Sequence, residues 1–396
     1  MMKVLNGLPP KALVFGLAAF TLVILIFNLS GRHASVPQST SLRTSKWWHK
    51  AGLLDPYADI QNSTLGFEKI FVLNMPERGD KRDAFSLVAS LTDLSVEYID
   101  GVSGETIPTK ALPVGQEHRK MPNNTLGSWR AHMNAIRTVV EQGYSSALIL
   151  EDDADWDLRI KAQLNEFAHG SRYLLGNSTD AYTHSPYGDS WDVLWVGLCH
   201  DKVPEDDARV YVVTNDQSVP LVKHLHMNNP EMLEAYPQHS RIIHMAGSPI
   251  CTYGYAISLK GAQKILWALS VKELRGIFDN ALSWWCEKND QQGLCISANP
   301  TYFYSHLFAG AQGKSSDIST NGPKFEKAET RNIRWSARMN IEKLLKGESD
   351  YTDAYPDDAP GDAEKGRAEA KARKEAQAAA AKAKEAEPEV VVEERE

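Results

Sequence analysis

An acidic triplet directly follows a short apolar run in this chain. Residues 147–150 read Ala-Leu-Ile-Leu, and Glu151, Asp152 and Asp153 come next. Such a run is typical of a buried strand, and the carboxyl ends of strands in an open α/β sheet are where these folds bind ligands. Carboxylate oxygens are the ligands that Mg²⁺ and Mn²⁺ prefer, so the triplet predicts a divalent cation site that can offset the charge of a phosphate group.

The geometry of the triplet depends on how far the strand extends. If the strand continues through the acids, Glu151 and Asp153 point to one side and Asp152 to the other. A plainer alternative is that Asp153 or Asp155 only caps a helix that passes through Leu158. The triplet alone does not decide between a cation site and a helix cap.

The elements that must position the triplet alternate between strands and helices. Apolar runs and periodic segments predict strands at 69–73, 96–100, 147–150, 191–196 and 253–258, and helices at 128–142 and 261–269. Strands that alternate with helices predict an α/β fold with a mostly parallel central sheet flanked by helices.

A basic loop follows the first of these strands. Pro76 and Gly79 end the strand, and a helical pattern resumes through Phe85. Backbone N–H groups at a helix N-terminus attract anions, and Arg78 or Arg82 can add bidentate contacts. The loop therefore predicts a binding site for an anionic ligand such as a phosphate, and the alternative is a solvated polar turn.

The chain has 396 residues and a formal net charge of −8 without a basic stripe, which argues against nucleic acid as a partner.

The two ends of the chain differ from its centre. Residues 12–29 are almost entirely apolar and predict a transmembrane anchor, with a cleaved signal peptide as the alternative. The predicted organisation is a short cytoplasmic tail (1–11), the anchor (12–29), a stem (30–66), the folded body (67–347) and a charged low-complexity tail (348–396).

Two features favour a lumenal location for the body. Triplets that begin at Asn62, Asn123 and Asn177 fit the acceptor pattern for N-glycosylation. The four cysteines permit two disulfides in any of three connectivities, and proximity favours the pair Cys286 and Cys295. Four buried thiols are the alternative. We therefore expect a single-pass type II glycoprotein whose body lies in a secretory compartment.

The motifs along the chain resemble those of the glycosyltransferases of family 25. This family includes bacterial lipooligosaccharide galactosyltransferases and animal collagen galactosyltransferases. One element departs from the family pattern, because Ala131 precedes His132 where the family usually has serine. The resemblance is carried by residues 70–74 with Arg78, Asp80 and Arg82, by 126–127, by 147–154, by 191–194, by 254–258 with 261–262, by Asp279, and by 316–318.

The resemblance implies a GT-A type nucleotide-diphospho-sugar transferase fold and a metal-dependent transfer of a sugar. By family membership the sugar is galactose, the donor is a uridine diphosphate sugar, and the acceptor is a glycan or glycoprotein. Mn²⁺ or Mg²⁺ would act as a Lewis acid on the departing nucleoside diphosphate. Together with the predicted anchor, the resemblance identifies the chain as a fungal-type, membrane-anchored member of the family, located in the Golgi or endoplasmic reticulum.

The resemblance also assigns roles to single residues. Asp279 is either a helix N-cap or an acidic residue whose carboxylate accepts a proton from the acceptor. Asp317 lies in a Gly- and Ser-rich stretch that can close over the donor. The assigned residues are Asp153 and Asp279 for catalysis, Glu151, Asp153 and His306 for the metal, and Asn74, Arg78, Arg82, Asp152 and Asp317 for the nucleotide sugar.

Two other functional classes stand beside a transferase. A metal-dependent phosphoesterase also uses clustered carboxylates, but further His and Asp ligands for a second metal are not evident in the sequence. A non-catalytic membrane-anchored scaffold with a degenerate transferase body is the other class. The intact acidic triplet argues against a scaffold, while the substitution at Ala131 leaves it open.

Overall fold

The computed structural model describes residues 55–115, 121–177, 183–227, 229–287, 294–319 and 324–361. The predicted anchor at 12–29 and most of the predicted tail lie outside these residues. Among the helices that are described, none combines the length and the apolar character that crossing a bilayer requires.

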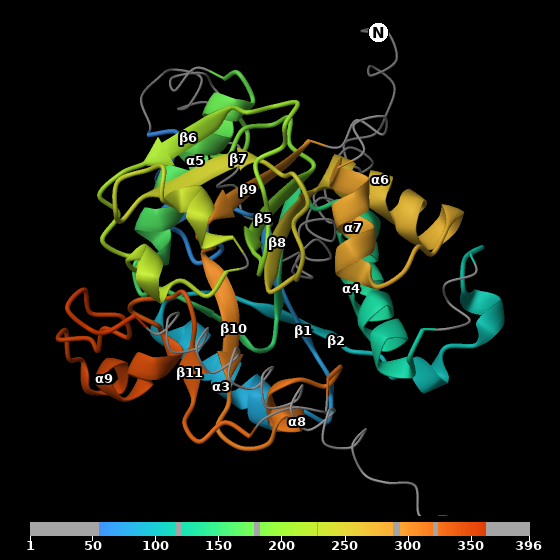
Figure 1. Ribbon diagram of the computed structural model, residues 1–396. Coiled ribbons are helices and arrows are strands. Elements are labelled where there is room, and N and C mark those ends of the chain that lie inside the picture. The colour runs from blue at the N-terminus through green and yellow to red at the C-terminus, as the bar shows by residue number, and fades with distance from the viewer. Residues whose placement is uncertain are drawn as a thin grey trace, which may run out of the picture. The chain divides into compact units, whose positions relative to one another are not determined.

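A mixed sheet of eight strands forms the centre of the body (Figure 1). The strand order is β2-β1-β3-β8-β5-β9-β7-β6. The pairings make β7 and β8 antiparallel to the other six strands, so the expected common direction holds for most of the sheet but not all of it. The strands are β1 (Lys69–Asn74), β2 (Glu97–Asp100), β3 (Ser146–Glu151), β5 (Val193–Gly197), β6 (Val210–Val213), β7 (Arg241–Met245), β8 (Gly254–Ser258) and β9 (Cys295–Asn299).

Helices cover both faces of this sheet (Figure 1). One face carries α4, α6 and α7, and the other carries α3 and α5. The predicted helix at 128–142 begins earlier, at Asn123, and the predicted helix at 261–269 continues as a π-helical segment, η7 (Trp267–Lys272). The α-helices are α3 (Gly79–Leu91), α4 (Asn123–Gln142), α5 (Ile160–Leu174), α6 (Leu259–Leu266), α7 (Phe278–Glu287), α8 (Gln312–Ser315) and α9 (Ile341–Lys346).

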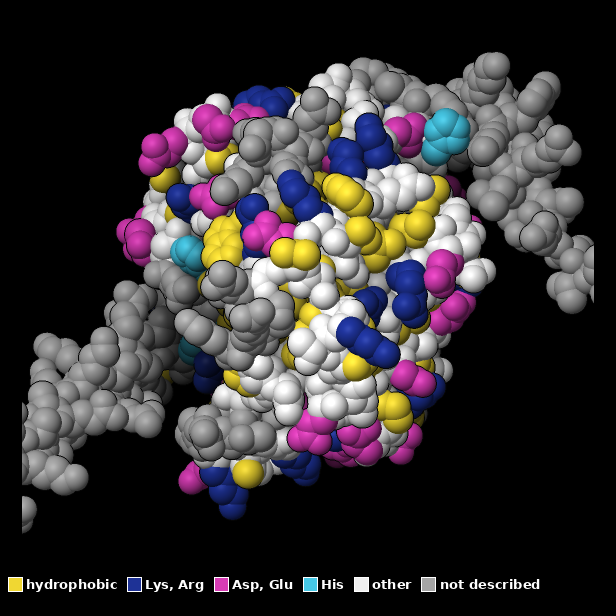
Figure 2. Space-filling view, turned by 90° about the vertical axis from the view of Figure 1, so that its right-hand side faces the viewer, with side chains coloured by type: hydrophobic (Ala, Val, Ile, Leu, Met, Phe, Trp, Pro, Cys, Tyr) yellow, Lys and Arg dark blue, Asp and Glu magenta, His cyan; other side chains and the backbone are white. Residues whose placement is uncertain are grey.

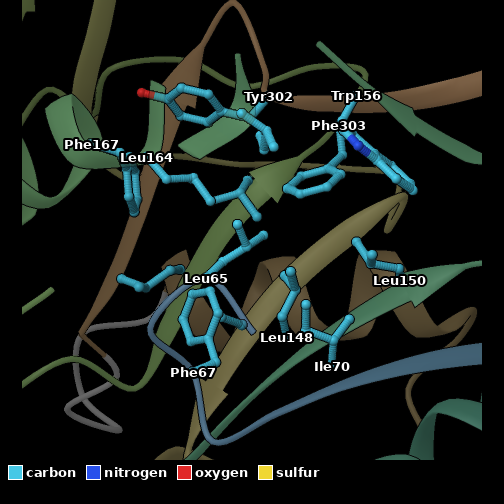
Figure 3. Close-up of a cluster of buried hydrophobic side chains, with 14 of the residues drawn as sticks. Leu65, Phe67, Ile70, Leu148, Leu150, Trp156, Leu164, Phe167, Tyr302 and Phe303 are labelled. Carbon is cyan, nitrogen blue, oxygen red and sulfur yellow. The ribbon is translucent and has the colours of Figure 1, made fainter. Parts of the chain in front are cut away.

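Side chains alternate from β1 and β3 into two separate apolar clusters. Ile70 and Leu148 belong to the cluster beneath α3 and α5, whereas Phe71 and Ile149 belong to the cluster beneath α4 and α6. Figure 3 shows the first cluster, in which Leu148 of β3 lies beside Ile70 of β1. Because both faces are buried, these strands are apolar throughout rather than at alternate positions, which made them readable in the sequence.

A small antiparallel sheet lies next to the acidic triplet and was not predicted. It contains β4 (Ala154–Trp156), β10 (Phe303–Leu307) and β11 (Glu329–Thr330). Strand β4 pairs with β10, with Asp155 opposite Tyr304. These strands are short, so their side chains give too few repeats for a period-two pattern to stand out.

The body extends beyond both predicted boundaries. Tyr57, Ile60 and Leu65 lie in the predicted stem, yet all three are buried in the core of the body. Tyr355 lies in the predicted tail and is also buried, and its hydroxyl donates a hydrogen bond to the carbonyl of Thr330. These residues pack with the body although the predicted boundaries assign them to the stem and the tail, and the predicted boundaries themselves stay a prediction.

Both pairs of cysteines form disulfides. Cys286 is bonded to Cys295, which confirms the favoured pair, and Cys199 is bonded to Cys251. The alternative of four buried thiols is thus wrong. Disulfides persist in oxidising compartments, so the pairing agrees with the expected secretory location.

The helices that cover one face of the sheet expose apolar side chains at the protein surface. Figure 2 looks onto the side that α4, α6 and α7 cover, and hydrophobic side chains gather there among lysines and arginines. Trp267, Val271 and Trp284 are exposed on η7 and α7, whereas the neighbouring Trp285 is buried. Trp285 is therefore a core residue.

Candidate active site

A cavity of about 400 Å³ lies at the carboxyl ends of β1 and β3. These two strands are parallel neighbours, with Leu73 opposite Glu151, so the residues that follow them meet at one edge of the sheet. The polar side chains that line the cavity come from five segments, and they are Asn74, Glu77 and Lys81, then Ser103 and Glu105, then Asn123, Asn124, Ser128 and His132, then Glu151, Asp152 and Asp153, and finally Ser315, Ser316 and Asp317.

The acidic triplet does not continue the strand. Strand β3 ends at Glu151, Asp152 and Asp153 form a turn, and β4 begins at Ala154. All three carboxylates therefore line the same cavity. The condition under which Asp152 would point away from the other two, a strand that continues through all three acids, is therefore not met.

Glu151 sits beside a neutral histidine. Thr252 Oγ1 donates a hydrogen bond of 2.8 Å to Glu151 Oε1, and His132 Nε2 lies 3.9 Å from the same oxygen. Burial against Phe278 and Tyr255 lowers the pKa of His132 to about 3, so the ring carries no charge that could balance Glu151. Burial, followed by the nearby Asp153 carboxylate, raises the pKa of Glu151 to about 8.

Asp153 has one carboxylate oxygen without a partner. Ser305 Oγ donates to its Oδ2 at 3.0 Å, while its buried Oδ1 accepts no hydrogen bond in the described structure. Burial raises the pKa of Asp153, against the opposing attraction of Lys81. A buried, unpartnered carboxylate oxygen next to a second carboxylate is a favourable position for a cation.

Asp152 is already neutralised by the protein itself. Lys81 Nζ donates to Asp152 Oδ1 at 2.8 Å and to Asp317 Oδ2 at 3.0 Å, and the lysine side chain is only 3% exposed. Asn74 Nδ2 donates to Asp152 Oδ2 at 2.9 Å. Asn74 lines the cavity, and its Oδ1 is buried and accepts no hydrogen bond in the described structure, so this oxygen is available to a ligand donor.

Arg78 holds the segment that closes the cavity. Its guanidinium makes two hydrogen bonds of 2.9 Å to Asp80, pairs with Asp317 and donates to the carbonyl of Lys314 at 2.6 Å. On the other side of the cavity, Asn124 donates to the carbonyl of Ile318. Arg78 does not line the cavity, so its contacts position the 314–318 segment.

Two further predicted residues, Arg82 and Asp279, lie outside the cavity lining. Arg82 places its guanidinium 4.2 Å above the Tyr98 ring. Asp279 accepts hydrogen bonds from the backbone N–H groups of Cys251, at 3.1 Å, and of its own neighbour Asn280. Asp279 lies in the first turn of α7 and binds the backbone of Cys251, so it does not cap the start of this helix, and its role as a catalytic residue stays a prediction.

His306 supports the acidic turn from behind. Its backbone N–H donates to the carbonyl of Asp153 at 2.8 Å, and its Nδ1 pairs with Thr330 Oγ1 at 2.8 Å. Since Ser305 on β10 faces Asp153, alternation turns the His306 ring to the opposite face of the strand. The ring does not line the cavity, so its predicted place as a third ligand gains no geometric support.

The cavity offers a cation two carboxylates, those of Glu151 and Asp153. Within the part of the chain that the structure describes, no group of three or more His, Cys, Asp and Glu side chains is arranged to enclose a metal ion. Glu151 and Asp153 nevertheless fit an oxygen-liganded cation, because one Asp153 oxygen is unpartnered and a cation of this type takes its remaining ligands from water and substrate phosphates.

Several residues of the site were not predicted. They are Lys81, Thr252, Ser305 and Arg338. Lys81 belongs to the segment that was predicted as a basic loop, but the prediction named Arg78 and Arg82 as the residues that contact an anion. The other three have no local signal, because they lie far along the chain from the acidic residues that they contact. The sequence separations of the bonded pairs are 101 residues for Thr252, 152 for Ser305 and 186 for Arg338.

Comparison with known proteins supports the resemblance to family 25. No family model matches the chain. The chain is 24% identical to procollagen galactosyltransferase 1 of Danio rerio, over 66% of the chain and 40% of that protein. It is 23% identical to a glycosyltransferase 25 family member of Drosophila melanogaster, over 67% of the chain and 40% of that protein.

A third relative is named as a probable inactive member of the same family. The chain is 21% identical to the probable inactive glycosyltransferase 25 family member 3 of Bos taurus, over 72% of the chain and 44% of that protein. The chain thus spans about two fifths of the length of these relatives. The similarity supports a transferase, while the activity of this chain needs its own test.

Proposed function

We propose that this protein is a metal-dependent glycosyltransferase with a GT-A type fold. It transfers a sugar, galactose by analogy with the relatives, from a uridine diphosphate sugar to a glycan or glycoprotein. The observation that carries the proposal is the unpartnered Asp153 Oδ1, which lies with Glu151 in a cavity at the ends of two parallel strands.

Each residue of the cavity has a separate part in this mechanism. Glu151 and Asp153 would hold Mn²⁺ or Mg²⁺, which when bound supplies Lewis-acid stabilisation of the departing diphosphate. Lys81 keeps the Asp152 carboxylate in place by a buried ion pair, and Asn74 presents a free carbonyl oxygen to a donor group of the nucleotide. Asp317, held by Arg78 and Lys81, closes the cavity over the bound donor.

We further propose a type II arrangement in the membrane of the Golgi or endoplasmic reticulum. The predicted anchor at 12–29, the predicted glycosylation triplets and the two disulfides support a lumenal body. The assignment to a fungal-type member stays a prediction from the sequence.

Thermal unfolding with a panel of nucleotide sugars tests the donor site. The purified full-length chain should be stabilised by a uridine diphosphate sugar when Mn²⁺ is present and not when EDTA is added. A ligand that binds only the folded state at a hundred times its Kd adds about 2.7 kcal/mol to the free energy of unfolding. If no nucleotide sugar stabilises the protein, the non-catalytic scaffold replaces the transferase.

A pair of matched variants tests the cation site. Asp153→Ala should abolish sugar transfer and the Mn²⁺-dependent stabilisation while the protein remains folded. Asp93→Ala removes a carboxylate whose side chain is 78% exposed and whose partner is Lys161, outside the cavity lining, so it should leave both readouts unchanged. Wild-type turnover in Asp153→Ala would remove this residue from the mechanism.

A further inference from the structure

Arg338 lies buried directly behind the acidic turn. It belongs to a short 3-10 helix, η9 (Arg338–Asn340), and only 6% of the residue is exposed. Its Nε donates to the carbonyl of Ala154 at 2.9 Å, and its Nη2 donates to the carbonyl of Asp152 at 2.8 Å. One guanidinium therefore holds the backbone on both sides of Asp153.

The charge of Arg338 is not consumed by a salt bridge in the described part of the chain. The guanidinium lies 5.4 Å from the centre of the Phe85 ring and 5.7 Å from that of Phe308, both of which are apolar surroundings. The Asp155 carboxylate attracts it most strongly, followed by those of Asp153 and Asp152. Because its hydrogen bonds go to backbone carbonyl oxygens, Arg338 leaves the Asp153 carboxylate available to the cavity.

A second contact fixes the same segment. The buried Asp155 carboxylate accepts hydrogen bonds from Thr330 Oγ1 at 2.6 Å, from Ser336 Oγ, and from the backbone N–H of Arg338 at 3.1 Å. These contacts place η9 against β4. The Arg338 side chain thus starts from a backbone that is itself tied to the acidic segment.

We propose that Arg338 is the positioning residue of the acidic turn. It holds the carbonyls of Asp152 and Ala154 so that the Glu151 and Asp153 carboxylates share the cavity, and its buried charge offsets part of the charge of Asp153 before a cation binds. The link to cation binding rests on the proposed function, whereas the link to the geometry of the turn does not.

Three variants separate positioning from general stability. Arg338→Met removes both hydrogen bonds and the charge, and Arg338→Lys keeps the charge but lacks the two-pronged planar donor geometry. Arg334→Met is the matched control, because Arg334 is a buried arginine of the same segment that pairs with Asp353 and Asp357 instead of the acidic turn.

Hydrogen exchange measures the geometry of the turn without any ligand. In Arg338→Met, amide exchange in residues 151–156 should be at least tenfold faster, while exchange in β1 stays at the wild-type rate. In Arg334→Met, residues 151–156 should exchange at the wild-type rate. Equal effects of the two variants on this segment would overturn the proposal. If Arg338→Met does not fold, Arg338→Lys serves in its place, with faster exchange confined to residues 151–156 as the expected result.

Kinetics measures the consequence for the cation. The Mn²⁺ concentration for half-maximal sugar transfer should rise at least tenfold in Arg338→Met, rise less in Arg338→Lys, and stay unchanged in Arg334→Met. Unchanged Mn²⁺ dependence in a folded Arg338→Met protein would overturn the role in cation binding. If the wild-type protein shows no transfer at all, the proposed function fails, and hydrogen exchange alone still decides whether Arg338 positions the turn.

Discussion

Replacing Lys81 by methionine should destabilise the protein far more than replacing an exposed lysine. Lys81 is 3% exposed and its ammonium contacts Asp152 at 2.8 Å and Asp317 at 3.0 Å. Burial alone would lower the pKa of Lys81, but the carboxylates of Asp153, Asp152 and Asp317 together raise it, so the lysine is charged. Methionine keeps the apolar stem and removes only the ammonium.

The expected loss of stability in Lys81→Met depends on how deeply each carboxylate that loses its counter-charge is buried. Asp152 is buried, and its side chain retains only the hydrogen bond from Asn74, so an uncompensated buried carboxylate should cost about 3–5 kcal/mol. Asp317 is 37% exposed at its side chain, and water can replace its partner at a cost of about 0–1 kcal/mol. The buried pair therefore accounts for most of the loss, against a total stability of about 5–15 kcal/mol.

Urea denaturation of two matched variants measures this difference. Lys161→Met is the control, because Lys161 also lies on a helix and pairs with Asp93 at 2.7 Å, but with side chains that are 23% and 78% exposed. It should cost about 0–1 kcal/mol. The double variant of Lys81→Met with Asp152→Asn should recover part of the loss, since no buried charge then lacks a partner. A Lys81→Met protein as stable as Lys161→Met would refute this reasoning.

Three further results are expected. Asp317→Asn should cost at most about 1 kcal/mol in urea denaturation but should raise the KM for the donor, and an unchanged KM would separate Asp317 from donor binding. In protein from a secretory host, peptide mapping should find a glycan on the exposed Asn62 and none on Asn123, because Asn123 lines the cavity; a glycan on Asn123 of active protein would contradict this. Removing the disulfide with a sequence separation of 52 should cost about 4 kcal/mol, against about 2.5 kcal/mol for the one with a separation of 9, and equal losses on thermal unfolding would contradict loop closure as the cause.

The central strands and the acidic turn could be predicted because their signals are local. Strands β1 and β3 are continuous apolar runs, since each packs against helices on both faces. Their parallel pairing brings Asn74 and Glu151 to one edge. Six further strands of the described structure were not predicted, and they are β4, β6, β7, β9, β10 and β11.

The basic loop shows where the prediction failed and why. Arg78, Lys81 and Arg82 are near neighbours in sequence, yet only Lys81 lines the cavity. Consecutive residues on an α-helix point about 100° apart, so Arg82 turns away from the cavity and lies over Tyr98. Arg78 precedes the helix and binds Asp80 and Lys314. The charge of the loop was readable, but the residue that reaches the ligand depends on the phase of the helix.

The contacts around the acidic turn divide its three carboxylates into different roles. Lys81 and Asn74 occupy Asp152, so this carboxylate is bound chiefly to the protein. Glu151 has only Thr252 as a direct donor and a neutral histidine beside it, and Asp153 keeps one oxygen without a partner. A cation that enters the cavity therefore meets Glu151 and Asp153 at the lower desolvation cost, because taking Asp152 would first require breaking a buried ion pair. For that reason substitutions at Glu151 and Asp153 should act mainly on the binding of the cation, and substitutions at Asp152 should act on the fold of the cavity as well.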